Sequence, residues 1–144
     1  MAIAEVQMPE VFISTHMLYW EQFDKLHVLH NAQYIVLFEH ARWEFWAHIG
    51  EDNNAPGADW PYYVASNTVN YRKAVREPQP ITIEVQVVRM KRVRLIMKHT
   101  LLDKNGDVCA EGEIVLVRVD RDTLKPISWS NRLKELVLPY TVEP

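Results

Sequence analysis

The stretch NAQYIVLFEHARWEFWAHIG, residues 31–50, decides the fold. Its apolar residues recur at spacings of three and four, the period of one face of an α-helix. These residues are Tyr34, Phe38, Ala41, Phe45 and Ile49. Neighbouring apolar side chains make this face wider than a solvent-exposed helix needs. Asn31 suits the N-cap and Gly50 suits the residue that ends the helix, so a helix is predicted between them.

The segments on both sides of this helix have β-strand character. Residues 11–19 are rich in β-branched and aromatic types, and a loop at 20–30 leads from them into the helix. After a second loop, at 50–61, four more strands are predicted. They lie at 62–71, around 81–87, at 94–102 and at 108–119. A short closing helix is expected within 128–137.

The order of these elements predicts an α+β fold. Asn105-Gly106, between the last two predicted strands, is a strong signal for a tight hairpin and therefore for antiparallel pairing. A helix that is apolar on more than one face is satisfied when a curved sheet wraps around it. We expect the 144 residues to form a single domain in which an antiparallel sheet wraps around one long central helix.

Composition excludes several classes of function. Sixteen basic and 19 acidic residues give a net charge of −3, which offers no general attraction to nucleic acid or anionic lipid. The first twelve residues do not resemble a signal peptide, and no apolar run approaches the length of a membrane span. We therefore expect a cytoplasmic protein without a nucleic-acid or membrane partner.

Two features that often mark chemistry are interpreted as structural. Cys109 is the only cysteine, which excludes an internal disulfide, and its apolar neighbours favour a buried side chain over a nucleophile. His27 and His30 form an H-x-x-H pair in the first loop, but no third ligand stands at a recognised spacing. No metal site is predicted.

The loop and helix start carry a family motif. Asp24 precedes Asn31, Ala32 and Tyr34 at a defined spacing, and the helix continues with Phe-Glu-x-Ala-Arg at 38–42. This combination resembles the signature of the hotdog-fold acyl-CoA thioesterases, in particular the 4-hydroxybenzoyl-CoA thioesterase family. The resemblance spans nearly the whole chain. It implies a hotdog fold, hydrolysis of an acyl-CoA thioester to a free acid and CoA, and a homodimer or homotetramer with sites at the subunit interface.

The chemistry of thioester hydrolysis fits these residues. Negative charge develops on the thioester carbonyl oxygen, and backbone N–H groups at a helix N-terminus stabilise such charge. The resemblance implies that the N–H of Asn31 has this role and that Asp24 is the catalytic carboxylate. Asp24 would act either as a nucleophile, through a mixed anhydride, or as a general base on water. CoA is part of the substrate, and no separate cofactor is expected.

Seven further residues are predicted to contact substrate. They are Tyr34, His27, His30, Glu39, Arg72, Lys91 and Arg92. The two histidines lie in the loop before the helix. Many relatives have glycine at the position of His27. The three basic residues belong to clusters suited to the phosphates of CoA. For Glu39 the preferred interpretation is a structural partner of Arg42, although some relatives use a glutamate of this helix for catalysis.

Other functions remain open from the sequence. A non-catalytic acyl-CoA-binding module is favoured by the irregular loop at 27–30, and an enoyl-CoA hydratase of the same fold is the less favoured enzyme. Acyl carrier protein is an alternative to CoA as the carrier. The five tryptophans are expected mostly in the core or a subunit interface, with a minority lining an acyl pocket.

Overall fold

The computed structural model describes residues 8–52 and 57–144. The chain forms five strands and two α-helices within these ranges, with two short 3₁₀ turns. In chain order the elements are β1 (Phe12–Met17), η1 (Trp20–Gln22), α1 (Asn31–Ile49), β2 (Tyr62–Tyr71), β3 (Pro80–Met90), β4 (Arg94–Leu102), β5 (Val108–Arg118), α2 (Asn131–Val137) and η2 (Leu138–Tyr140).

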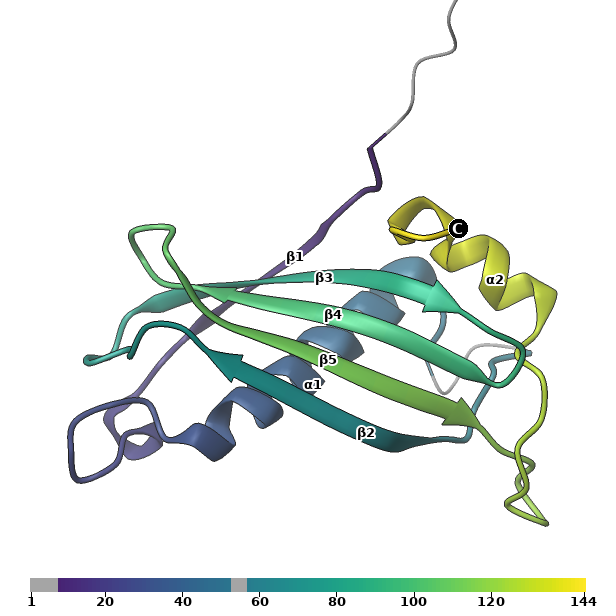
Figure 1. The fold of residues 1–144 in the computed structure, drawn as a ribbon, viewed down its shortest axis with the longest axis horizontal. Helices are drawn as coiled ribbons and strands as arrows, with labels where there is room; N and C mark the ends of the chain where they lie inside the picture. The colour runs from purple at the N-terminus through teal and green to yellow at the C-terminus, as the bar shows by residue number, and fades with distance from the viewer. Residues whose placement is uncertain (1–7, 53–56) are drawn as a thin grey trace, which may run out of the picture.

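The five strands form one antiparallel sheet in the order β1-β3-β4-β5-β2. The long helix α1 lies across one face of this sheet (Figure 1). Tight hairpins join β3 to β4 and β4 to β5, and Gly106 adopts a φ of 82° in the second of them. The left-handed conformation of Gly106 explains why the hairpin needs glycine there. The expected α+β arrangement of an antiparallel sheet and one long helix is confirmed.

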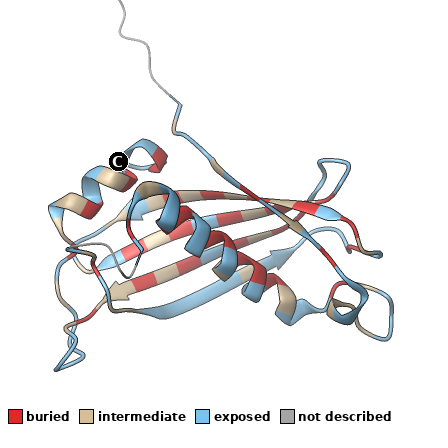
Figure 2. Ribbon diagram, turned by 180° about the vertical axis from the view of Figure 1, so that it is seen from behind, coloured by how far each residue is buried: buried red, intermediate tan, exposed pale blue. Residues whose placement is uncertain are grey.

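The core lies between α1 and the inner face of the sheet. Alternate residues of β3 and β4 are buried, as the two-residue period of a strand requires, and β5 follows the same pattern over most of its length. On α1 the buried positions form a stripe that faces the strands (Figure 2). Gly112 of β5 packs directly beneath Phe38, where a Cβ atom would lie 2.5 Å from the ring. The close approach of helix and sheet therefore depends on glycine at this position.

The helix start differs by one residue from the prediction. His30, not Asn31, is the N-cap, because its Nδ1 accepts a hydrogen bond from the N–H of Ala32 at 3.1 Å. Asn31 is the first helical residue. Histidine is an uncommon cap, so residue preference pointed to its neighbour. At the other end Gly50 has a φ of 81° and terminates the helix, as expected.

The C-terminal segment completes the sheet edge and the core. The predicted closing helix is α2, and the ring of Tyr140 beyond it packs against Phe45 of α1 with centroids 5.0 Å apart. The N–H of Val142 donates to the carbonyl of Val87, so the last residues run beside the part of β3 that lies beyond the first residue of β1. This end of the molecule is thereby covered, whereas β2 remains an edge strand.

None of the helices in the two described ranges has the length and apolarity to cross a membrane. The cytoplasmic location and the single domain stay predictions.

Candidate active site

Asp24 lies in a small hairpin-like loop between β1 and α1. The N–H of Asp24 donates to the carbonyl of Val28 at 3.0 Å, and Phe23 pairs with Leu29 next to it. Oδ1 of Asp24 accepts from the N–H of Leu26 at 2.8 Å and from that of Val28 at 3.4 Å. No hydrogen bond to Oδ2 is recorded from the described residues. One carboxylate oxygen therefore orders the loop, while the other is available for chemistry.

His27 stands at the turn of this loop in an unusual conformation. Its φ is 58°, which places it in the left-handed region that favours glycine. This geometry accounts for the glycine that many relatives have at the equivalent position. The imidazole is exposed and packs edge-on against Trp20, with centroids 5.7 Å apart. His27 thus contributes to the outer wall of the loop.

The backbone N–H of Asn31 lies at the first turn of α1. The carbonyl of His30 accepts from the N–H of Gln33 at 2.9 Å, and the His30 ring caps the N–H of Ala32. For the N–H of Asn31 the structure records no acceptor among the described residues. This donor sits at the positive end of a 19-residue helix. It has the properties required of an oxyanion donor.

A cavity of about 270 Å³ opens beside this helix start. Its lining comes from the loop, from α1 and from the segment that follows β2. The lining residues are Val28, Leu29, Asn31, Tyr34, Tyr71, Arg72, Lys73 and Ala74. The hydroxyl of Tyr71 donates to the carbonyl of Asn31 at 3.1 Å, and its ring meets the buried Tyr34 edge-on at 5.0 Å. Burial raises the pKa of Tyr34 to about 12, so this hydroxyl stays protonated.

Two cations stand at the mouth of this cavity. Arg72 pairs with Glu111 at 3.2 Å and is largely exposed. Lys73 bonds Asp103 at 2.8 Å and Asp107 at 2.6 Å, and these hydrogen bonds raise the pKa of its ammonium group. Arg72 was predicted to bind substrate and Lys73 belongs to the same predicted basic cluster, whereas Tyr71 was not predicted, since only the packed fold brings it beside Asn31.

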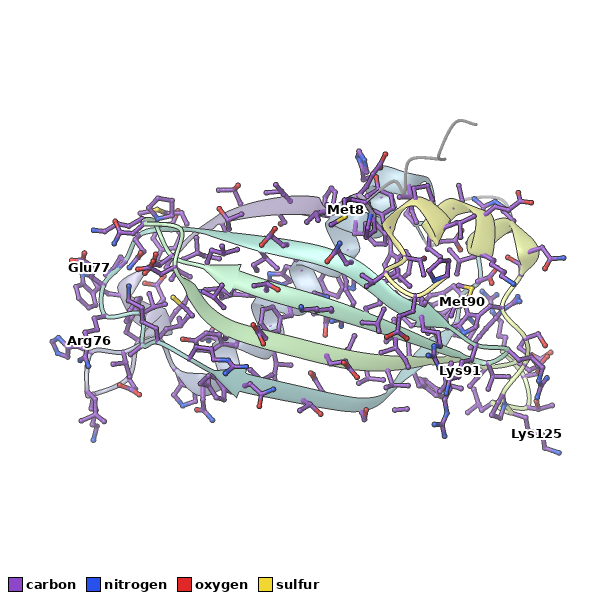
Figure 3. The ribbon with its side chains drawn as sticks, turned by 45° about the horizontal axis from the view of Figure 1, so that its top comes forward. Met8, Arg76, Glu77, Met90, Lys91 and Lys125 are labelled. Carbon is purple, nitrogen blue, oxygen red and sulfur yellow. The ribbon has the colours of Figure 1, made fainter. Side chains whose placement is uncertain are left out.

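Lys91 and Arg92 do not join this group within one protomer. They lie in the turn after β3, while Asp24 follows β1, whose last residue pairs with the first residue of β3. The full length of β3 therefore separates Lys91 and Arg92 from Asp24. Figure 3 shows the two ends of the molecule, with Lys91 at one end and Arg76 at the other. Within one protomer Lys91 and Arg92 are therefore far from Asp24, and their contact with substrate stays a prediction. Sequence does not reveal the end of the sheet at which a turn lies.

Glu39 lines a different and larger cavity, of about 510 Å³, along the second half of α1. Its other walls are Arg42, Trp43, Trp46, Glu51, Asp52, Trp60, Tyr62 and Val64. Glu39 and Arg42 form no ion pair within 4.0 Å among the described residues, but the Glu39 carboxylate is near enough for its charge to favour the charged form of Arg42. Arg42 is only 5% exposed, and burial lowers its pKa. A basic residue inside the core was not foreseen from the sequence.

In the described part of the chain, no three His, Cys, Asp or Glu side chains are grouped so that they could hold a metal ion. His27 and His30 serve the loop and the helix cap.

Comparison with known proteins bears on the family and the fold. The family model of the thioesterase-like superfamily matches residues 18–137. The acyl-CoA thioester hydrolase YbgC of Escherichia coli O6:H1 is 26% identical over 110 residues, or 76% of this chain and 82% of that relative. The DHNA-CoA thioesterase of Staphylococcus aureus superposes with a TM-score of 0.77 at 21% identity, covering 88% of this chain and 87% of that chain. A thioesterase of Thermus thermophilus complexed with coenzyme A and Zn gives 0.75 at 21%, covering 87% and 90%.

Proposed function

Because this chain belongs to the thioesterase-like superfamily, we propose that it hydrolyses an acyl-CoA thioester to a free acid and coenzyme A. Membership confirms the family resemblance carried by residues 20–42, and the solved structures agree with the hotdog fold. The observation that carries the proposal is the free N–H of Asn31 at the start of α1, beside a cavity and next to the Asp24 loop.

The reaction uses two groups of this chain. The thioester carbonyl oxygen accepts a hydrogen bond from the N–H of Asn31, and the helix dipole stabilises the negative charge that develops there. In one route Oδ2 of Asp24 attacks the carbonyl carbon, the C–S bond breaks to release CoA as its thiolate, and water hydrolyses the resulting mixed anhydride to the free acid and Asp24. In the other, Oδ2 removes a proton from water as it attacks the carbonyl carbon, and the C–S bond then breaks to give the free acid and the CoA thiolate, which takes up the proton. Oδ1 keeps its bonds to the loop during either step, which holds the carboxylate in place.

The remaining cavity residues bind rather than react. Tyr34 and Tyr71 form an apolar wall beside the helix start, and Arg72 stands at the rim, where a CoA phosphate would meet a guanidinium. Acyl carrier protein as the carrier stays an alternative, since it presents a phosphopantetheine arm to the same donor.

We further propose a homodimer or homotetramer in which β2 lies at a subunit interface. Eight of the ten residues of β2 are exposed, and its outer edge is unpaired within the described sheet. Exposed apolar side chains of α1, among them Ile35, Val36 and Trp43, lie on the adjoining helix. An open strand edge next to an apolar surface favours association of identical chains. Light scattering after size-exclusion chromatography tests this assembly.

The decisive experiment measures thiol release from acetyl-, dodecanoyl- and benzoyl-CoA by wild type and by Asp24→Asn. The amide oxygen of asparagine preserves the Oδ1 hydrogen bonds but removes the carboxylate. We expect kcat/KM to fall by about 10²-fold or more. Asp120→Asn is a matched control, because Asp120 also accepts from two N–H groups of its own turn, at 2.9 Å each.

The possible results point to different readings. Loss of turnover in folded Asp24→Asn, with Asp120→Asn unaffected, supports a catalytic carboxylate. Equal rates in all three proteins would remove Asp24 from the reaction and direct attention to Glu39. Tight binding of acyl-CoA without any turnover would favour the non-catalytic binding module, and hydration of crotonyl-CoA would favour the hydratase.

A further inference from the structure

The larger cavity along the second half of α1 is not used by the reaction at Asn31. Its walls are largely aromatic, with Trp43 and Trp46 from the helix, Trp60 from the preceding loop and Tyr62 from β2. Arg121 lies over the ring of Trp60 at 5.1 Å and fixes the outer wall. A cavity of about 510 Å³ with such walls is of the size that holds a substantial organic group.

Three side chains that line this cavity carry hydrogen-bond donors: Arg42, Trp46 and Tyr62. Arg42 is 5% exposed, and no hydrogen bond from its guanidinium to another described residue is recorded. Trp46 is 3% exposed, and its buried Nε1 meets no acceptor within full hydrogen-bond geometry, although the Tyr62 hydroxyl lies close enough to interact with it. Burial raises the pKa of Tyr62, so its hydroxyl is also a donor. A buried donor without an acceptor, as at Trp46 Nε1, is costly in a folded protein and favours a ligand oxygen at this place, where the charge of Arg42, also felt by Tyr62 and Glu39, adds to the attraction.

The two cavities lie along the same seam between α1 and β2. Asn31, Ile35, Glu39, Arg42 and Trp46 follow one another at spacings of four, four, three and four, which places them on one face of the helix. β2 runs in the opposite direction beside this face, since Tyr71 contacts Asn31 and Tyr62 packs near Trp46 at 6.2 Å. The helix rise places Arg42 about 16 Å from Asn31. A medium-length acyl chain spans this distance.

We propose that the acyl group of the substrate extends along the α1–β2 seam and carries, at its far end, an oxygen that accepts hydrogen bonds from Arg42, Trp46 and Tyr62. This inference rests on the proposed thioesterase function and adds the chemical class of the acyl group. Ile35 and Val69 offer apolar contacts between the two ends. A hydroxyl at the tip also donates to Glu39, and a carboxylate gains the charge of Arg42.

The expected selectivity follows from the cost of burying unpaired donors. An unsubstituted chain that reaches the cavity displaces water from the three donors and returns no acceptor. A site built to hydrogen-bond a substrate oxygen discriminates strongly against the analogue that lacks it. The oxygenated chain is therefore the preferred substrate, and a short acyl group that does not reach the cavity is unaffected by it.

The test compares kcat/KM for dodecanoyl-CoA, ω-hydroxydodecanoyl-CoA and the mono-CoA thioester of dodecanedioic acid. We expect wild type to prefer at least one oxygenated ester by about tenfold or more. Arg42→Met and Tyr62→Phe should each lower that preference, measured as the ratio of kcat/KM for the oxygenated ester to kcat/KM for dodecanoyl-CoA, several-fold. Tyr63→Phe is the matched control, because Tyr63 follows Tyr62 on the opposite face of β2 and does not line the cavity.

Each result has a defined meaning. Preference for either oxygenated ester, reduced by Tyr62→Phe but not by Tyr63→Phe, supports the proposal, and the better of the two shows whether charge or neutral hydrogen bonding dominates. Equal kcat/KM for all three esters in wild type overturns it while leaving the thioesterase function intact. Absence of turnover with every ester, including acetyl- and benzoyl-CoA, would overturn the proposed function and this inference with it.

Discussion

The Tyr71 hydroxyl donates a hydrogen bond to the backbone carbonyl of Asn31, with an oxygen–oxygen distance of 3.1 Å. This bond joins the last residue of β2 to the first residue of α1. It fixes the start of the helix against the wall of the smaller cavity. The position of the free Asn31 N–H relative to the substrate therefore depends on a side chain from a strand distant in sequence.

Replacement of Tyr71 by phenylalanine should affect catalysis more than stability. The bond lies at an exposed site, so its loss should change the free energy of unfolding by no more than about 1 kcal/mol. Small displacements of an oxyanion donor reduce rate, and we expect kcat/KM to fall about three- to tenfold. Thiol-release assays and urea unfolding measure the two quantities. Tyr63→Phe, on the same strand, should change neither, and an equal loss in both variants would show a general effect of the strand.

Local patterns were sufficient to locate most of the elements. The strands Tyr62–Tyr71 and Arg94–Leu102 have the predicted bounds, and the strand that starts at Val108 ends at Arg118, one residue before the predicted end. The helix was found because its apolar residues repeat with the helical period over five turns. The apolar residues of an element recur with a fixed period because one side of it faces the core. This pattern involves only residues that are close in sequence, so it can be recognised without the fold.

The features of the fold and the site that the sequence did not predict depend on long-range packing. The strand order, with β2 beyond β5, depends on pairing between segments far apart in the chain. The burial of Arg42 and the distance of Lys91 from Asp24 follow from that order and not from spacing. The family resemblance named Asp24 and Asn31 as site residues, but only the folded chain shows that the Asn31 N–H is free and that Asp24 shares its carboxylate with the loop.

Gly112→Ala should destabilise the fold through contact with Phe38. The added Cβ would lie 2.5 Å from the ring, which is fully enclosed between helix and sheet. Overpacking of this kind costs about 1–3 kcal/mol. Chemical denaturation of the variant should show this loss, and Phe38→Leu in the same background should recover part of it. Unchanged stability of Gly112→Ala alone would show that helix and sheet can separate more easily than their packing indicates.

Substitutions at His27 should raise or lower the free energy of unfolding, depending on the backbone preference of the new residue. Glycine adopts a φ of 58° without steric cost, so His27→Gly should raise the free energy of unfolding by up to about 1 kcal/mol. Valine is disfavoured in this region and should lower it by about 1 kcal/mol or more. Thermal unfolding of both variants compares them directly. A loss of stability in His27→Gly would mean that the ring contact with Trp20 outweighs the backbone strain.

Acid should destabilise the protein through the buried His99. Burial, followed by the nearby Arg42, lowers the pKa of His99 to about 3 in the folded chain, and its Nε2 has no partner in the described structure. The unfolded chain, with a pKa near 6.5, binds the proton more readily. Stability is therefore complete above about pH 6.5 and is lost as the pH falls toward 3, by at most about 1.4 kcal/mol per pH unit.

Replacing His99 by leucine should make this pH dependence shallower. Urea unfolding at pH 7.5 and pH 5 measures the slope, in a window above the range where carboxylates titrate. Burial also lowers the pKa of His16, which contributes in the same direction, so part of the slope should remain in His99→Leu. An unaltered slope in His99→Leu would mean that water reaches the imidazole and that helix and sheet open around it at mildly acidic pH.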